Sequence, residues 1–398
     1  MNIHTKSWFR HYFSVAGACC LFALASLPAH AQSADNFPKD APRYAYDSTW
    51  PKPLPNHWTY EGITGLFVDK DDHIWVLQAA TNFAKDTTMN FASLHPPAAT
   101  CCLQPPSVLE FDVEGNLIRS WGGPDYVPGW PNPEHTIFTD RAGNVYVGGS
   151  APGDSLLKFT ADGKFLSDFG HRGPKMPDST PFSAQKLDNQ QTALLLRGVA
   201  SGEMDDDAHE LYIGDGYLNK RVMVYDPDTG AFKRGWGAFG VPLSEIDNDQ
   251  PPPHNPAGPP AKQFHEVHCV HLSRDGLVYV CDRHEDRVQV FTKQGKFLKE
   301  FPVANETLGN GSAGSLAFSH DPQQKYIYVT DMMNNVVWIL NRGDGAIVGK
   351  IGFPGYQGGA LHQVHVIATD SHGNVYTGEV GSAPRVQKFV PVNGGSAR

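Results

Sequence analysis

The stretch from Phe264 to Leu272, FHEVHCVHL, opens a run of four short segments rich in β-forming residues. A Ser-Arg-Asp-Gly turn follows it, and the three further runs lie at 277–283, 287–291 and 296–301. Asp-Gly between two apolar runs is a strong signal for a β-hairpin. Four antiparallel strands in about 35 to 40 residues is the size of one blade of a β-propeller, so the stretch predicts a blade.

Comparable units recur on both sides of this blade. Six units are expected in all, at 62–122, 135–170, 197–237, 264–301, 315–352 and 365–389. The sixth lacks a clear fourth run, which a ring closed by strands from both ends of the chain would explain, because closure removes exposed sheet edges. We therefore predict an all-β, six-bladed β-propeller over residues 61–398.

The remaining segments are expected to pack on this ring. Residues 32–60 are rich in proline and aromatic residues, and we expect them to pack on the ring or to close it. Long inter-blade loops at 79–106, 171–196 and 238–264 are expected to cover a site or one face, because long loops on a rigid scaffold usually do.

The first 31 residues have the pattern of a secretory signal peptide. Lys6 and Arg10 precede an apolar core, and an Ala-His-Ala cleavage site ends at Ala31, directly before Gln32. A lipoprotein signal ending at Cys19 is the alternative. The pattern predicts a periplasmic or secreted protein whose mature chain starts near Gln32.

Composition and charge narrow the range of partners. Glycine (40), proline (31) and only 19% charged residues favour a turn-rich β protein. Without Lys6 and Arg10, the mature chain has 30 basic and 42 acidic residues, a net charge of −12. That charge repels nucleic acid and anionic membranes, and no apolar run long enough for a membrane span follows the signal peptide. A small molecule or a peptide is the expected partner.

Three histidines share one register of the repeat. His135, His268 and His365 each lie 11 residues before a tyrosine of the second strand. The first strand of each propeller blade lines the central channel, so imidazoles from blades two, four and six should converge on the axis. Three neutral imidazoles with one open position make a catalytic-type zinc site. The alternative is a set of polar side chains bound to channel water. His265 and His362 are candidates for the rim of the site or the surface.

The sequence says less about whether the charged residues near these histidines belong to the site. Glu134 and Glu266 precede two of the histidines and should point to the opposite face if the strand is regular. The third unit has Arg197 where the others have histidine, and a guanidinium near the axis would suit a carboxylate substrate. A salt bridge from Arg197 to the acidic loop 205–207 is the alternative.

The repeated turn, the apolar-Tyr-Val run and the Arg-Val-x-Val-Phe run resemble those of NHL-repeat propellers. Within that group, the chain resembles the lyase domain of peptidyl-glycine α-amidating enzymes over roughly residues 60–390. The resemblance implies zinc held by His135, His268 and His365. Asp-Gly-Tyr-Leu-Asn-Lys-Arg at 215–221 matches that family's Asp-Gly-Tyr-Cys-Asn-x-Arg motif except at the cysteine, which implies a catalytic Tyr217.

By this resemblance, zinc or another divalent metal would polarise an α-hydroxyglycine substrate, Tyr217 would act as general base, and the products would be an amide and glyoxylate. Two positions depart from the family. Its catalytic arginine has no counterpart in loop 79–106, which contains Lys85 but no arginine, and the aspartate of its calcium site is Val366 here. Whether the protein also binds calcium is therefore left open. The alternative function is a non-catalytic NHL propeller that binds a protein or glycan through its loops.

Four cysteines remain in the mature chain. Cys269 and Cys281 lie on neighbouring strands of one hairpin, which predicts either a cross-strand disulfide or an adjacent thiol pair. Cys101 and Cys102 are expected to form a vicinal disulfide near the channel mouth, and a sulfur ligand to the metal is the alternative.

Overall fold

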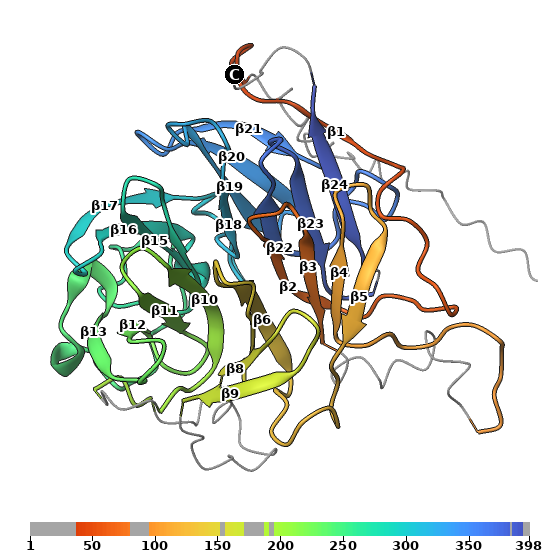
Figure 1. Ribbon diagram of the computed structural model, residues 1–398. Helices are drawn as coiled ribbons and strands as arrows, with labels where there is room; N and C mark the ends of the chain where they lie inside the picture. Colours follow the sequence, from red (N-terminus) through yellow and green to blue (C-terminus); the bar gives the residue numbers. More distant parts are fainter. Residues whose placement is uncertain are drawn as a thin grey trace, which may run out of the picture. The chain divides into compact units, whose positions relative to one another are not determined.

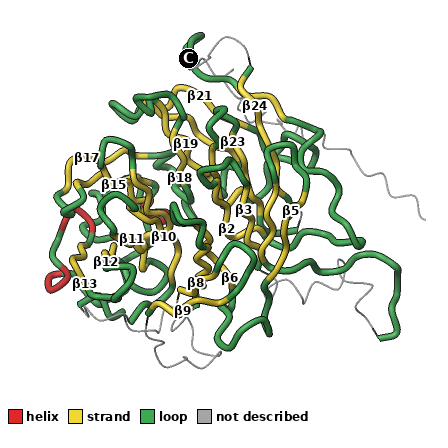
Figure 2. The backbone as a smooth tube through the Cα atoms, in the orientation of Figure 1, coloured by secondary structure: helices red, strands yellow, loops and turns green. Residues whose placement is uncertain are grey.

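The computed structural model describes residues 37–79, 95–151, 156–170, 187–190, 195–382 and 384–392. Six antiparallel sheets of four strands each surround a common axis, which confirms the predicted six-bladed β-propeller (Figure 1). The innermost strands contact one another in the order β2, β6, β10, β14, β18, β22 and back to β2. The ring therefore closes through its inner strands (Figure 2).

The strands of the blades follow the predicted units. Blade one contains β2 (Ile63–Val68), β3 (Ile74–Gln78), β4 (Val108–Phe111) and β5 (Leu117–Trp121). Blade two contains β6 (Glu134–Thr139), β7 (Val145–Gly149), β8 (Leu156–Phe159) and β9 (Phe165–Phe169). Blade three contains β10 (Val199–Asp205), β11 (Glu210–Asp215), β12 (Arg221–Tyr225) and β13 (Phe232–Trp236).

Blade four contains β14 (Val267–Leu272), β15 (Leu277–Asp282), β16 (Arg287–Thr292) and β17 (Phe297–Pro302). Blade five contains β18 (Leu316–Phe318), β19 (Tyr326–Asp331), β20 (Val336–Asn341) and β21 (Ile347–Ile351). Blade six contains β22 (Val364–Thr369), β23 (Val375–Glu379), β24 (Val386–Pro391) and β1 (Tyr44–Tyr46). Short 3₁₀ turns occur at η3 (Ala238–Gly240), η4 (Leu243–Glu245) and η5 (Arg283–Glu285).

The turns between the first and second strands of the blades explain why the repeat is easy to recognise in the sequence. In blade two, Asp140 Oδ1 accepts the backbone N–H of Asn144 at 2.8 Å, and Gly143 adopts the positive φ of 83° that the turn requires. In blade six, Asp370 Oδ1 accepts the backbone N–H of Asn374 at 2.8 Å in the same way. The second-strand tyrosine of that blade, Tyr376, then donates its hydroxyl hydrogen bond to Asp370 at 2.9 Å.

The N-terminal segment supplies the outermost strand of blade six. β1 pairs with β24 in antiparallel fashion, with Tyr44 opposite Pro391. Trp50 is 2% exposed and packs its ring on Phe111 of blade one and Tyr376 of blade six, at centroid distances of 5.9 and 4.9 Å. This side chain therefore joins the first and last blades.

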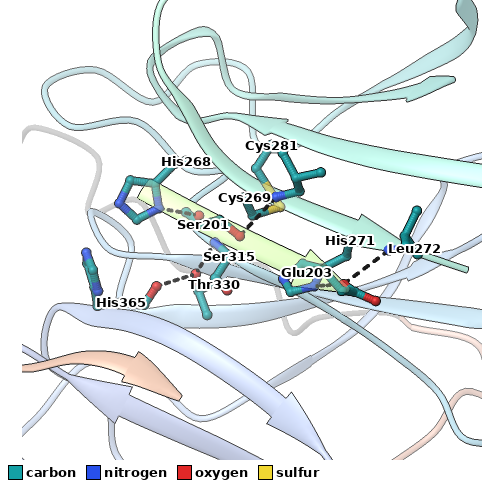
Figure 3. Close-up of a disulfide and its surroundings, with 12 residues drawn as sticks. Ser201, Glu203, His268, Cys269, His271, Leu272, Cys281, Ser315, Thr330 and His365 are labelled. Atoms are coloured by element: carbon teal, nitrogen blue, oxygen red, sulfur yellow. Dashed lines mark hydrogen bonds and ion pairs between the residues drawn. A yellow bond between two sulfur atoms is a disulfide. The ribbon is translucent and has the colours of Figure 1, made fainter. Parts of the chain in front are cut away.

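One of the two disulfides among the described residues lies within blade four. Cys269 faces Cys281 across the β14–β15 ladder and is bonded to it, so the thiol-pair alternative is wrong (Figure 3). Cys101 and Cys102 are also bonded to each other. The residue that follows this pair, Leu103, exchanges backbone hydrogen bonds with His57 and Thr59 of the N-terminal segment.

Several sequence predictions fall on other parts of the chain. The predicted signal peptide with Gln32, Lys85 of the first long loop and most of loop 171–196 lie outside the described residues. Within the described residues, no helix has both the length and the apolar composition needed to cross a membrane.

We predict that Trp50→Ala lowers the free energy of unfolding by about 3–5 kcal/mol, because it leaves a cavity where blades one and six meet. Chemical denaturation followed by tryptophan fluorescence would measure the change. Ile118→Ala, at a position 39% exposed on β5, is the control and should change stability by less than about 0.5 kcal/mol. Equal losses in the two variants would contradict this role of Trp50.

Candidate metal centre

A β-bulge places each of the three histidines. In blade two, Glu134 and Thr136 have partners on β7, but His135 between them is the extra residue. His268 and His365 occupy the same place in the β14–β15 and β22–β23 ladders, where the register also shifts. A bulge re-aims the side chain of the extra residue, so the regular alternation of faces does not apply at these positions.

The three imidazoles meet at one point on the axis. Their ligand atoms all lie within 4.8 Å of one another. The ring centroids are 5.1 Å apart for His135–His268, 5.0 Å for His135–His365 and 4.9 Å for His268–His365. All three side chains are buried, with 3–5% exposure. Blades two, four and six therefore contribute a compact, nearly symmetric three-His group.

Backbone carbonyls of the intervening blades orient these rings. His135 Nδ1 donates to the carbonyl of Ala200 in blade three at 3.0 Å, and His268 Nδ1 donates to that of Gly314, ahead of β18 in blade five, at 2.6 Å. Since a carbonyl can only accept, Nδ1 carries the proton in both rings and Nε2 keeps its lone pair. The backbone of Thr64 lies close enough to His365 to favour a proton on that ring. His365 Nδ1 nevertheless makes no hydrogen bond of normal geometry with a described residue.

Tyr217 reaches the group from the turn that follows β11. Its hydroxyl oxygen lies 2.6 Å from His135 Nε2 and 3.0 Å from His268 Nε2. The turn packs closely against blade four, because a Cβ atom on Gly216 would lie only 1.8 Å from the carbonyl oxygen of Val267. Only glycine fits there, and the turn thereby holds Tyr217 over the histidines.

Arg283 is a site residue that the sequence analysis missed. It follows β15 in η5 and is 7% exposed, and its Nη1 lies 3.0 Å from His268 Nε2. Its Nη2 lies 2.7 Å from the carboxylate of Glu266, which holds the guanidinium in place. The sequence signal was its place in Cys-Asp-Arg at 281–283, directly after the strand that pairs with the His268 strand.

The other candidate residues lie apart from the three-His group. Arg197 donates its backbone N–H to Asp215 at 2.7 Å, and among the described residues its guanidinium contacts neither the histidines nor loop 205–207. Glu134 binds the side chains of Ser107 and Trp130, and Glu266 pairs with Arg283, so neither glutamate beside a histidine joins the group. His265 contacts Glu285, and His362 stacks on Tyr356.

Burial sets the protonation states of the site. It lowers the pKa of His135 to about 3, and the Arg283 charge acts in the same direction. Burial also lowers the pKa values of His268 and His365 well below the usual range. The same burial raises the pKa of Tyr217, while the Arg283 charge opposes that rise. The histidines are therefore neutral at physiological pH, which is the form that binds metals.

The donor set fits a divalent transition metal. Three neutral imidazole nitrogens suit zinc and its neighbours, and the Tyr217 hydroxyl and the Arg283 guanidinium lie within hydrogen-bond distance of these nitrogens. Calcium requires oxygen ligands, and the side chain after the last histidine, Val366, offers none. A second group, Asp69, His73 and Glu110, is a poor cation site because Arg119 already pairs with Glu110 at 2.5 Å.

Comparison with known proteins agrees with the repeat and the fold. No family model matches the chain. NHL repeat-containing protein 3 of Homo sapiens is 25% identical over 72% of this chain and 74% of its own length, and the Mus musculus protein is 26% identical over 72% and 73%. This chain is an NHL-type β-propeller.

The chain is also similar in sequence to an amidating monooxygenase and in structure to two lyases. Peptidyl-glycine alpha-amidating monooxygenase B of Xenopus laevis is 26% identical over 47% of this NHL-type propeller and 20% of its own length. Streptogramin B lyase is similar in structure, with a TM-score of 0.46 and 10% identity over 88% of this chain and 98% of its own. Virginiamycin B lyase from Staphylococcus aureus has a TM-score of 0.43 and 12% identity over 83% and 84%.

We predict that Gly216→Ala displaces the Tyr217 turn and destabilises the protein by about 1–3 kcal/mol, because the new methyl group would overlap the Val267 carbonyl. Thermal and chemical denaturation would measure the loss. Gly343→Ala is the matched control, since the nearest obstacle there is the end of the Asn341 side chain at 3.1 Å. A fully stable Gly216→Ala protein would contradict the close packing of this turn.

Proposed function

We propose that the three-His group binds a divalent transition metal, zinc in the first place, and that the protein is a lyase of the amidating type. The substrate class is a peptidyl-α-hydroxyglycine or a related small polar molecule with a carboxylate. One observation carries the proposal: a tyrosine hydroxyl and a guanidinium, from Tyr217 and Arg283, both reach the metal-facing nitrogens of the same three-His group.

A metal held by His135, His268 and His365 would supply Lewis-acid polarisation of a substrate oxygen. Tyr217 is placed to exchange a proton with that oxygen, since its hydroxyl already lies within hydrogen-bond distance of two of the three ligand nitrogens. Burial raises the pKa of Tyr217, and the positive charge of Arg283 limits that rise, which is the direction that a general base requires.

Arg283 also supports a carboxylate substrate. Its guanidinium is held at one nitrogen by Glu266, which fixes its orientation, and such a fork is suited to bind carboxylate oxygens. We propose this residue in the anion-binding role that the sequence analysis gave to Arg197. In the reaction, the substrate hydroxyl loses its proton to Tyr217, the bond between carbon and amide nitrogen breaks, and the nitrogen takes up a proton. The products are an amide and glyoxylate.

We also propose that the protein is exported. Two disulfides are present, and such bonds persist in oxidising compartments such as the periplasm or the extracellular space. The signal-peptide pattern of the first 31 residues supports the same location.

A binding function is the second candidate. A cleft of about 480 Å³ lies between blades five and six, and Tyr44, Tyr326 and Asp321 are among its lining residues. A cleft of this size fits a small ligand such as part of a glycan. In that case the histidines would hold water or a structural ion, and the metal analysis below separates the two candidates.

We expect purified, unchelated protein to contain about one equivalent of a transition metal, measured by inductively coupled plasma mass spectrometry. His268→Ala should reduce this to less than about one tenth, because loss of one of three ligands removes a large share of the affinity. His209→Ala, whose exposed ring pairs with Asp228, should retain the metal. Metal-free protein whose melting temperature is unchanged by a chelator would refute the metal centre.

We expect wild-type protein to release glyoxylate from an α-hydroxyglycine peptide, and Tyr217→Phe to lower kcat by at least about 100-fold, as expected for loss of a general base. Arg283→Lys should mainly raise KM for substrates with a carboxylate. Tyr212→Phe is the matched control, because its hydroxyl binds Glu210 and Arg234 instead. Equal release by wild type and Tyr217→Phe, or none by wild type, counts against the lyase.

A further inference from the structure

A polar chamber lies on the axis of the ring, beside the three-His group. It is a cavity of about 30 Å³, and His135 and His268 form part of its wall. Hydroxyl side chains from blades one, two, three and five form another part, namely Thr64, Thr136, Ser201 and Ser315. One water molecule needs about 10–15 Å³ of such space, so the chamber has room for about two.

The hydroxyl of Thr64 indicates that the chamber is wet. Thr64 is 8% exposed, and its Oγ1 is buried without a hydrogen-bond partner among the described residues. Leaving such an atom without any partner costs about 1–3 kcal/mol, so buried hydroxyls that line a polar cavity normally bind ordered water. The chamber therefore offers water a partner next to the imidazole rings.

A second cavity lies next to the chamber, toward the other end of the inner strands. Its volume is about 150 Å³, and it shares Leu66, Phe67 and His271 with the chamber. The exposed residues Arg274 and His320 line it, so it reaches the protein surface. Since β14 begins beside His268 and ends at Leu272, this opening is on the face opposite Tyr217 and Arg283.

His271 stands where the two cavities meet. Its Nδ1 lies 2.8 Å from Oε2 of Glu203, and the same oxygen accepts the backbone N–H of Leu272 at 3.2 Å (Figure 3). With Nδ1 held by a carboxylate, Nε2 is the ring nitrogen left to exchange protons with the cavities. Figure 3 shows Ser201 and Ser315 between this pair and the histidines of the three-His group.

We propose that these two cavities form an axial shaft that carries protons, through water and hydroxyl groups, between the three-His group and the opposite face of the ring. Each hydroxyl accepts one hydrogen bond and donates another, so a proton moves along the shaft without leaving a net charge in its wall. Nε2 of His271 is the hydrogen-bonding group that links the chamber to the cavity lined by Arg274 and His320. The shaft goes beyond the lyase proposal and does not require it, because the chamber touches the imidazoles whatever they bind.

The Nδ1 protons of His135 and His268 test this path directly, because both rings line the chamber. Nuclear magnetic resonance of the full chain labelled with ¹⁵N-histidine measures how fast these protons exchange with water, without turnover. We expect exchange to be at least about tenfold slower in Thr64→Val combined with Thr136→Val, since these side chains keep the volume of the wall but lose its hydroxyl groups.

A second variant blocks the far end of the shaft. His271→Leu combined with Glu203→Gln removes the relay without leaving an unpaired carboxylate, and it should slow exchange to a similar extent. Thr377→Val is the matched control, because Thr377 Oγ1 is likewise buried without a partner but lines neither cavity. Unchanged exchange in both shaft variants, or equal slowing in the control, would show that protons arrive by another route and would overturn the proposal.

Crystallography supplies an independent readout. A crystal structure should show ordered water within hydrogen-bond distance of Thr64 Oγ1, and that water should be lost in Thr64→Val. A chamber that is dry, or filled by a metal ion, would also overturn the proposal.

Discussion

The hydrogen bonds from His135 and His268 to the backbone of the next blade are the interactions on which the site depends. His135 and His268 donate to Ala200 and Gly314, and these carbonyls belong to blades that contribute no ligand of their own. Alternate blades thus supply the three imidazoles, and two of the blades between them supply carbonyls that orient the rings. The arrangement requires a closed ring, because His365 lies on β22, and β22 contacts β2 from the opposite end of the chain. The pairing of β1 with β24 and the packing of Trp50 keep those two blades together.

Burial gives the site its chemical character. It keeps the three imidazoles neutral, and it makes the buried Arg283 cation depend on its ion pair with Glu266. A guanidinium beside neutral histidines is a preorganised partner for an anion, since the protein has already oriented it before the ligand arrives. On the other side, the hydroxyl groups of Thr64 and Thr136 line the chamber beside the same rings. The group therefore has different chemistry on its two sides.

Much of the fold and the position of the histidines followed from spacing alone. A propeller repeats one local unit, so residues at equal distances from the second-strand tyrosine occupy equivalent places, and His135, His268 and His365 meet as that register implied. The bulge at each histidine was not foreseen, because period-2 reasoning assumes regular strands. Arg197 was expected near the axis for the same reason of register, yet the structure shows no contact between its guanidinium and the histidines.

The sequence by itself determined the blades, the register of the three histidines and the Asp-Gly-Tyr motif, because these depend on local turn chemistry and on short-range periodicity. Only the tertiary structure decided that Arg283 joins the histidines, that Cys269 and Cys281 are bonded, and that hydroxyl groups line an axial shaft. Each of these depends on how separate strands or blades approach one another and on which way a side chain turns at a strand end. Those distances are set by packing around the closed ring, and no local pattern in the sequence encodes them.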